Sequence, residues 1–349
     1  VSDEDMDGNP NVNGARERDF AAIVGGVSKV DPLTGLALTN INYDSIEEVE
    51  VITAGAGVEF GRAQGGFANI IEKQGSNQFE GVSNFLFRTS ALDGNGASNV
   101  PEKDIQDFEW IQPAIQISGP IMRDKLWYRL SHDWRKIEVP IQVGSGVEVQ
   151  TQEQTTSSDM ITWQASRRNK LAFSFLSDPQ TTDNIGVNST NPTETTYTVH
   201  TEGPLYRLSW TAPYSPRLLV DSLMAYQDAS LNISPTTNGI ANTCVVGLPF
   251  LENAQCVDLV TGQTSGSYNI NWDDQRQRFT VRTQASIFGG RFWGSSHQFT
   301  VGFDAENERY ERTLDQRPEL TFFETSNRNS GEVERVGLVS ARLTVPSVS

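Results

Sequence analysis

The stretch that decides the fold is Ile46–Phe79, which reads IEEVEVITAGAGVEFGRAQGGFANIIEKQGSNQF. It contains two short β-type runs on either side of a glycine-rich centre. Glycines this close together permit positive φ angles and a close approach of backbones. The pattern is not a phosphate-binding loop, because the required Gly-Lys-Ser/Thr ending is missing. We therefore expect a compact glycine-rich unit with strands at Val49–Thr53 and Phe67–Glu72.

From Phe79 onward the sequence alternates between apolar and polar residues. The clearest case is Arg278–Ile287, because successive side chains of a strand point to opposite faces. One face then carries Phe279, Val281, Thr283, Ala285 and Ile287, and the other carries Arg278, Thr280, Arg282, Gln284 and Ser286. About ten such strands are expected, the last at Val333–Val345.

The predicted connections between these strands alternate in length. Short links are expected at 119–125, 167–170, 212–217 and 288–297. Long links are expected at 89–107, 135–158, 177–204, 227–275 and 311–332. Outer-membrane barrels sort their connections in this way, with short periplasmic turns and long extracellular loops. The pattern predicts an antiparallel barrel wall in which Phe279, Val281, Ala285 and Ile287 face lipid.

Composition excludes several classes of protein. The 349 residues carry a formal net charge of −17, which argues against nucleic acid because phosphate binding needs a Lys/Arg patch. No apolar run of about 18 residues is present, as a membrane helix would need, whereas barrel strands need only alternate. The three histidines, His132, His200 and His297, are far apart and lie in no catalytic or metal-ligand spacing. We expect no enzyme, no metal and no cofactor.

The two cysteines, Cys244 and Cys256, lie in one Pro/Gly/Asn-rich segment. No histidine is near them, so a disulfide in an oxidising compartment fits better than a metal pair. The alternative is two unrelated reduced thiols.

Several motifs resemble those of TonB-dependent outer-membrane receptors, in particular the Oar-like branch. Ile46–Val51 and Phe60–Gly75 resemble the end of the family's plug, and Ser118–Ile121 with Asp124–Tyr128 resembles its first barrel hairpin. Two departures are Phe60, where tyrosine is common, and Glu72, where threonine is common. Both replace only a side chain, so the backbone path is expected to persist.

The resemblance implies a mostly β protein with two domains. Residues 1–78 would form a small mixed α/β plug, and residues 79–349 the first part of an antiparallel transmembrane β-barrel. The barrels of this family have 22 strands, and large barrels of this kind hold a plug in their lumen. About ten strands would leave the barrel incomplete. We therefore expect further polypeptide before Val1, including the TonB box, and beyond Val333–Val345.

The resemblance also implies active uptake of a scarce ligand across the bacterial outer membrane. The expected partners are a TonB-type energy-coupling complex, outer-membrane lipid or lipopolysaccharide, a ligand of unknown identity, and a surface-exposed lipoprotein or other outer-membrane subunit. The alternative function is that of a cell-surface structural or adhesive β-protein without transport activity.

Two groups of candidate site residues follow. The plug motif comprises Gly61, Arg62, Gly65, Gly66, Asn69 and Lys73. Polar contacts between plug and wall are expected from Glu59, Arg62, Glu72 and Lys73 on the plug, and from Arg129, Arg207, Arg278 and Arg282 on the polar faces of wall strands. For each single charge the alternative is a solvated residue of the lumen.

Overall fold

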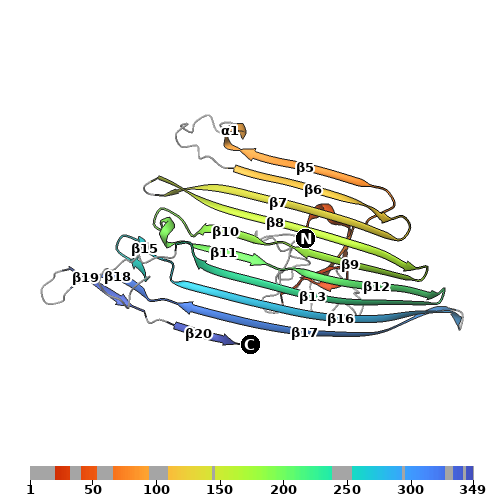
Figure 1. Ribbon diagram of the computed structural model, residues 1–349. Helices are drawn as coiled ribbons and strands as arrows, with labels where there is room; N and C mark the ends of the chain where they lie inside the picture. The colour runs from red at the N-terminus through yellow and green to blue at the C-terminus, as the bar shows by residue number, and fades with distance from the viewer. Residues whose placement is uncertain are drawn as a thin grey trace.

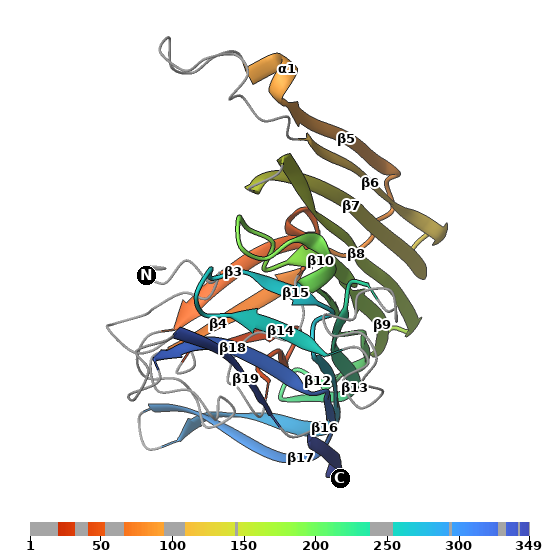
Figure 2. The same ribbon diagram turned by 90° about the vertical axis from the view of Figure 1, so that its left-hand side faces the viewer.

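The computed structural model describes residues 20–31, 41–52, 66–93, 109–143, 146–237, 254–292, 295–326, 333–340 and 343–348. These residues form three β-sheets (Figures 1 and 2). Among them there is no helix both long and apolar enough to cross a membrane.

The first sheet, called here the N-terminal sheet, has the strand order β2-β1-β4-β3. Its strands are β1 (Phe20–Val24), β2 (Val27–Ser28), β3 (Ile46–Ile52) and β4 (Gly66–Glu72). β1 and β4 pair in parallel, and the other pairs are antiparallel. A 3-10 turn, η2 (Tyr43–Ser45), precedes β3 and is capped by the Asn42 side chain. The two strands predicted around the glycine-rich centre correspond to β3 and β4.

The second sheet, the wall sheet, contains twelve strands, and all its neighbours are antiparallel. They are β5 (Glu80–Thr89), β6 (Glu109–Met122), β7 (Leu126–Val143), β8 (Gly146–Ser166), β9 (Asn169–Ser177), β10 (Gln180–Ile185), β11 (Tyr197–Glu202), β12 (Leu205–Ser215), β13 (Leu218–Pro235), β16 (Ile270–Phe292), β17 (Ser295–Gln316) and β20 (Leu343–Val348). β9 and β10 share one place in the sheet, as do β11 and β12, so the wall is ten places wide. This agrees with the expected number. A short helix, α1 (Ser90–Asp93), follows β5.

The third sheet has the order β15-β14-β18-β19. It consists of β14 (Gln255–Asp258), β15 (Thr264–Gly266), β18 (Glu319–Ser326) and β19 (Val333–Val339). The prediction of one final wall strand at Val333–Val345 is therefore wrong. β19 pairs with β18 in the third sheet, and only β20 rejoins the wall beside β17. Ser340 ends β19 by hydrogen bonding to the backbone of Glu319 with both its N–H and its hydroxyl.

The predicted turn at 119–125 is shorter than expected. β6 continues to Met122, and the turn is Arg123–Lys125, with Asp124 at φ 62°. Gly119 belongs to the strand β6, where its lack of a side chain leaves room for the Phe79 ring. A Cβ at Gly119 would lie 2.3 Å from the Phe79 ring, so glycine lets the chain pass over β6 as it enters the wall.

The predicted long link at 135–158 is also wrong, because β7 and β8 continue through most of it as paired strands. Other wall strands are equally long, and β16 has 23 residues. A tilted membrane-spanning strand needs about 9–11 residues, whereas 23 residues at about 3.3 Å each extend about 75 Å. The wall thus rises well beyond the thickness of a bilayer.

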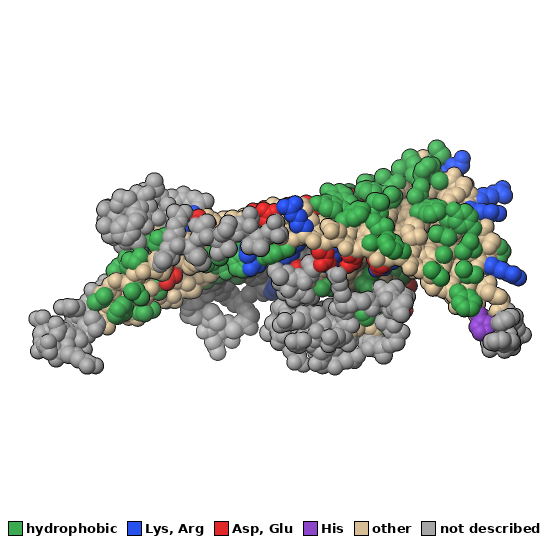
Figure 3. Space-filling view, turned by 90° about the horizontal axis from the view of Figure 1, so that it is seen from below, with side chains coloured by type: hydrophobic (Ala, Val, Ile, Leu, Met, Phe, Trp, Pro, Cys, Tyr) green, Lys and Arg blue, Asp and Glu red, His purple; other side chains and the backbone are tan. Residues whose placement is uncertain are grey.

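The outer face of the wall carries an apolar belt near one end of the strands (Figure 3). This is the end with the tight turns at 123–125, 167–168 and 216–217, called here the turn end. The alternation predicted for Arg278–Ile287 is confirmed, because Phe279 and Ile287 are exposed while Arg278 and Thr280 are buried on the inner face.

Candidate functional site

The N-terminal sheet lies against the inner face of the wall (Figure 2). The centre of the contact is apolar. Val24, Val27 and Ile41 form one buried cluster with wall residues Leu176, Leu205, Leu223 and Ala225. Polar contacts surround this cluster, and most of them come from wall arginines.

Two arginines of β16 hold the edge of the N-terminal sheet. Arg278 donates to the carbonyl oxygens of Ser28 (3.0 Å) and Val30 (2.7 Å), and Arg282 donates to that of Gly26 (2.9 Å). Ser28 and Val30 are alternate residues, so their carbonyls point to the same side of the extended chain, whereas Gly26 lies in the turn before β2. β2 is an edge strand, and its outward carbonyls are satisfied by side chains rather than by another strand.

Arg207 and Arg129 make comparable contacts from other strands. Arg207 donates to the Val24 carbonyl (3.0 Å) and forms a buried ion pair with Glu72. Gly25 makes room for this guanidinium, because a Cβ there would overlap it and the backbone has φ 51°. Arg129 donates to the Asp44 carbonyl (3.1 Å) and to Gln116 Oε1 (2.7 Å).

A second ionic cluster lies further along β16 and β17. Asp274 is fully buried and accepts hydrogen bonds from Arg276 Nη2 (3.0 Å), Arg312 Nε (2.7 Å) and Nη2 (2.8 Å), and the Tyr310 hydroxyl (3.1 Å). Arg276 Nε lies 3.1 Å from Asp31, which follows β2. The Arg312 guanidinium lies 4.3 Å from the centre of the Trp272 ring. This cluster connects the wall to the N-terminal sheet.

Lys29 is the most deeply buried amine at the interface, with 4% of its surface exposed. Burial lowers its pKa from the ordinary value of 10.5 to about 8, and the nearby Asp178 and Glu72 carboxylates oppose this shift. The lysine is therefore mostly charged at neutral pH.

Stability is expected to rise with pH between about 8 and 10.5. In that range the unfolded chain still holds the Lys29 proton while the folded chain has released it, so the free energy of unfolding increases with pH. Other groups also titrate there, so the test compares thermal midpoints of the wild type and Lys29→Met across this range. The thermal midpoint of the wild type, relative to that of Lys29→Met, should increase as the pH rises. If this difference in midpoint stays constant or decreases, the pKa assigned to Lys29 is contradicted.

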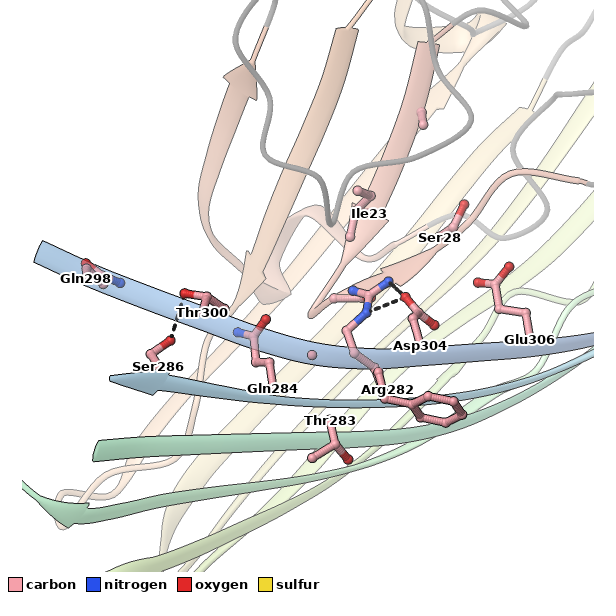
Figure 4. Close-up of a pocket in the computed structure, with 14 residues that line it drawn as sticks. Ile23, Ser28, Arg282, Thr283, Gln284, Ser286, Gln298, Thr300, Asp304 and Glu306 are labelled. Carbon is pink, nitrogen blue, oxygen red and sulfur yellow. Dashed lines mark hydrogen bonds and ion pairs between the residues drawn. The ribbon is translucent and has the colours of Figure 1, made fainter. Parts of the chain in front are cut away.

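The interface also holds open space. A cavity of about 730 Å³ lies between the N-terminal sheet and β16–β17, lined by Ile23, Gln284, Thr300 and Asp304 among others (Figure 4). A second, of about 420 Å³, extends toward β12 and β13. Both are lined by Arg282, whose Nε donates to Asp304 Oδ2 (2.7 Å). The N-terminal sheet is thus held by separate polar contacts beside its apolar centre, with room for water between them.

Each of the predicted wall arginines contacts the N-terminal part of the chain, from β7, β12 or β16. Arg129, Arg207, Arg278 and Arg282 all reach the N-terminal residues, and Glu72 meets Arg207. Lys73 instead donates to the Asp44 carbonyl within the N-terminal part (3.0 Å). Gly66 and Asn69 lie in β4, and Asn69 lines the second cavity. Glu59, Gly61, Arg62 and Gly65 lie outside the described residues.

Sequence reasoning missed Lys29, Asp31, Asp274, Arg276 and Arg312. Arg276 and Asp274 share the inward parity of Arg278, so the alternation of β16 could have found them. Lys29 and Asp31 lie outside any periodic run, and no signal in the sequence marks them. Cys256 lies in the third sheet and is disulfide-bonded, whereas Cys244 lies outside the described residues.

Comparisons with known proteins agree with this architecture. No protein-family model matches the chain. The chain is 28% identical to the TonB-dependent transporter Oar of Myxococcus xanthus over 124 residues, which are 34% of this chain and 12% of that protein. It is 27% identical to a probable TonB-dependent siderophore receptor, PirA, of Acinetobacter baumannii over 144 residues, which are 39% of this chain and 18% of that protein.

Solved structures show the same fold. The outer-membrane transporter YddB of Escherichia coli superposes with a TM-score of 0.65 at 13% identity, covering 93% of this chain and 46% of YddB. FpvA of Pseudomonas aeruginosa, solved with bound pyoverdine and iron, gives a TM-score of 0.58 at 9% identity, covering 94% of this chain and 42% of FpvA. The chain spans less than half of each protein it matches here.

In sequence the chain is similar to TonB-dependent transporters and receptors, and in fold it is similar to solved outer-membrane transporters and siderophore receptors. Its described part corresponds to an incomplete β-barrel with an additional sheet on the inner face of the wall.

Proposed function

We propose that this chain supplies the plug and the first part of the barrel of an active outer-membrane transporter, with residues 1–78 as the plug and 79–349 as barrel wall. A TonB-type complex of the inner membrane would drive it. The N-terminal sheet would block the lumen at rest and rearrange when the complex transmits energy. The ligand would be a scarce nutrient bound on the side of the long loops.

The observation that carries this proposal is the chemistry of the interface. Five wall arginines reach the N-terminal sheet, mostly through its backbone carbonyls, around a small apolar centre flanked by cavities. Each such hydrogen bond to a charged guanidinium contributes only about 1.5–3 kcal/mol net, because water replaces it when it breaks. A sheet held in this way can be displaced repeatedly, whereas a large dry core would hold it permanently.

The proposal is tested by labelling buried positions of the N-terminal sheet in living cells. Val24 and Val27 are 0% and 1% exposed, so Val24→Cys and Val27→Cys should react with a small charged maleimide only when the sheet moves. Energised cells of the native host should label them several-fold faster than cells treated with a proton uncoupler. Ser76→Cys is exposed and serves as the control that reacts in both conditions.

The same experiment separates the two candidate functions. Equal labelling of Val24→Cys and Val27→Cys with and without the uncoupler would overturn the transporter assignment, since a structural or adhesive protein has no use for energy. We expect the uncoupler to slow labelling at these two buried positions only, and to leave the labelling rate of Ser76→Cys unchanged.

A further inference from the structure

The turn end of the wall carries a group of cations without partners. Arg123, Lys125, Arg167, Arg168 and Arg217 lie in the three described tight turns, and all five are exposed. Within the described residues none of their side chains has a hydrogen-bond or ion-pair partner. The single carboxylate of these turns, Asp124, accepts a hydrogen bond from Asn77 (2.6 Å).

Most other cations of the described part of the wall are engaged. Arg207, Arg276, Arg278 and Arg282 contact the N-terminal sheet, and on the outer face Lys136 pairs with Glu138 and Arg309 with Glu311. The chain as a whole is strongly acidic, at −17. Five cations at one end of such a molecule, without partners among the described residues, are therefore a marked separation of charge.

These cations lie directly beside the apolar belt. Ile121 is exposed two residues before Arg123, Trp163 four residues before Arg167, and Tyr214 three residues before Arg217. At about 3.3 Å per residue the charges lie roughly 7–13 Å along the strand from the last lipid-facing side chain. Figure 3 shows this arrangement, with Lys and Arg projecting past the edge of the hydrophobic surface. Long basic side chains at this depth reach the headgroup layer.

We propose that the turn end binds anionic phospholipid headgroups of the leaflet on its own side of the membrane, through Arg123, Lys125, Arg167, Arg168 and Arg217. Guanidinium groups pair with phosphate oxygens in two parallel hydrogen bonds, and Lys125 contributes a point charge. The aromatic side chains of Trp163 and Tyr214 mark the boundary of the hydrocarbon at the same level. In outer-membrane barrels short turns face the periplasm, so the lipids bound would be those of the periplasmic leaflet.

The test measures lipid preference of the full-length protein reconstituted in phosphatidylcholine bilayers. Brominated phosphatidylglycerol or brominated phosphatidylcholine is added at low mole fraction, and quenching of tryptophan fluorescence reports lipid in contact with the wall. The wild type is expected to prefer phosphatidylglycerol by about threefold or more, since several cations near an anionic headgroup each favour binding. The preference should fall as salt is raised.

Two variants locate the site. Replacing Arg123, Arg167, Arg168 and Arg217 by glutamine should reduce the preference to near one, with the folded barrel retained in a heat-dependent gel-mobility assay. The control Lys136→Gln with Arg309→Gln removes cations from the other end of the wall and should keep the preference. No preference in the wild type, a preference that survives the glutamine variant, or equal loss in the control would each overturn the proposal. If the wild type shows no preference for phosphatidylglycerol, an acidic protein partner would remain as the ligand of these cations.

Discussion

Replacement of Arg207 by methionine is expected to destabilise the attachment of the N-terminal sheet by about 3–5 kcal/mol, because the change leaves the buried Glu72 carboxylate without its direct partner. The Arg207 and Glu72 side chains are 6% and 3% exposed. Arg207 also satisfies the Val24 carbonyl, which methionine cannot do. The measurement is thermal unfolding of the full-length protein in detergent, followed by near-ultraviolet circular dichroism.

A matched set of variants separates loss of the pair from loss of packing. Arg207→Met with Glu72→Met removes both charges and is expected to be less destabilised than Arg207→Met alone. Arg309→Met removes an exposed arginine paired with Glu311 and should change stability by no more than about 0.5 kcal/mol. If Arg207→Met resembled Arg309→Met, the ion pair with Glu72 would have no structural importance.

The second large effect is expected at Asp274. Its carboxylate is fully buried and balances Arg276 and Arg312, so Asp274→Ala would leave Arg276 with its contact to Asp31 and remove the carboxylate that Arg312 binds. Breaking a buried ionic cluster by removing one member costs about 3–5 kcal/mol. A lower unfolding midpoint should be accompanied by altered fluorescence of Trp272, because Arg312 would no longer be held against that ring.

Coupling through Arg276 is a separate part of this prediction. The double variant Asp274→Ala with Arg276→Met should lose less than the sum of the two single variants, since the two side chains act together. If the losses in stability are strictly additive, Asp274 acts only on its contacts with β17 and does not help Arg276 to hold Asp31.

Much of the wall could be predicted from the sequence because a strand repeats every two residues. The parity of Arg278–Ile287 identified the inward arginines, which the structure brings to the carbonyls of the N-terminal sheet. At 135–158 the alternation is weaker, because 150–158 is polar on both faces, although Ile137, Val139 and Ile141 still alternate with other residues along β7. In that region the alternation of apolar and polar residues no longer distinguishes a lipid-facing side of the strand from a side that faces the lumen.

Other features were beyond reach of local patterns. Lys29 and Asp31 owe their importance to partners about 150 to 245 positions away, Asp178 and Arg276, and no short-range signal encodes such a meeting. The division of Val333–Val345 between two sheets depends on Ser340 closing against Glu319. The wall arginines were identified as polar-face residues, but the carbonyls that they bind could not be named in advance.

The arginine contacts along Gly26–Val30 also have a mechanical consequence. A strand pulled parallel to a paired neighbour must break all its ladder hydrogen bonds at once, which makes such an assembly resist force strongly. Here each guanidinium stands on its own flexible stem, and the carbonyls of Gly26, Ser28 and Val30 are held by only two of them. Tension applied from the N-terminal side would load these attachments in succession. The peak load would then be set by one contact at a time, and the sheet could peel away in small steps while the wall stays intact.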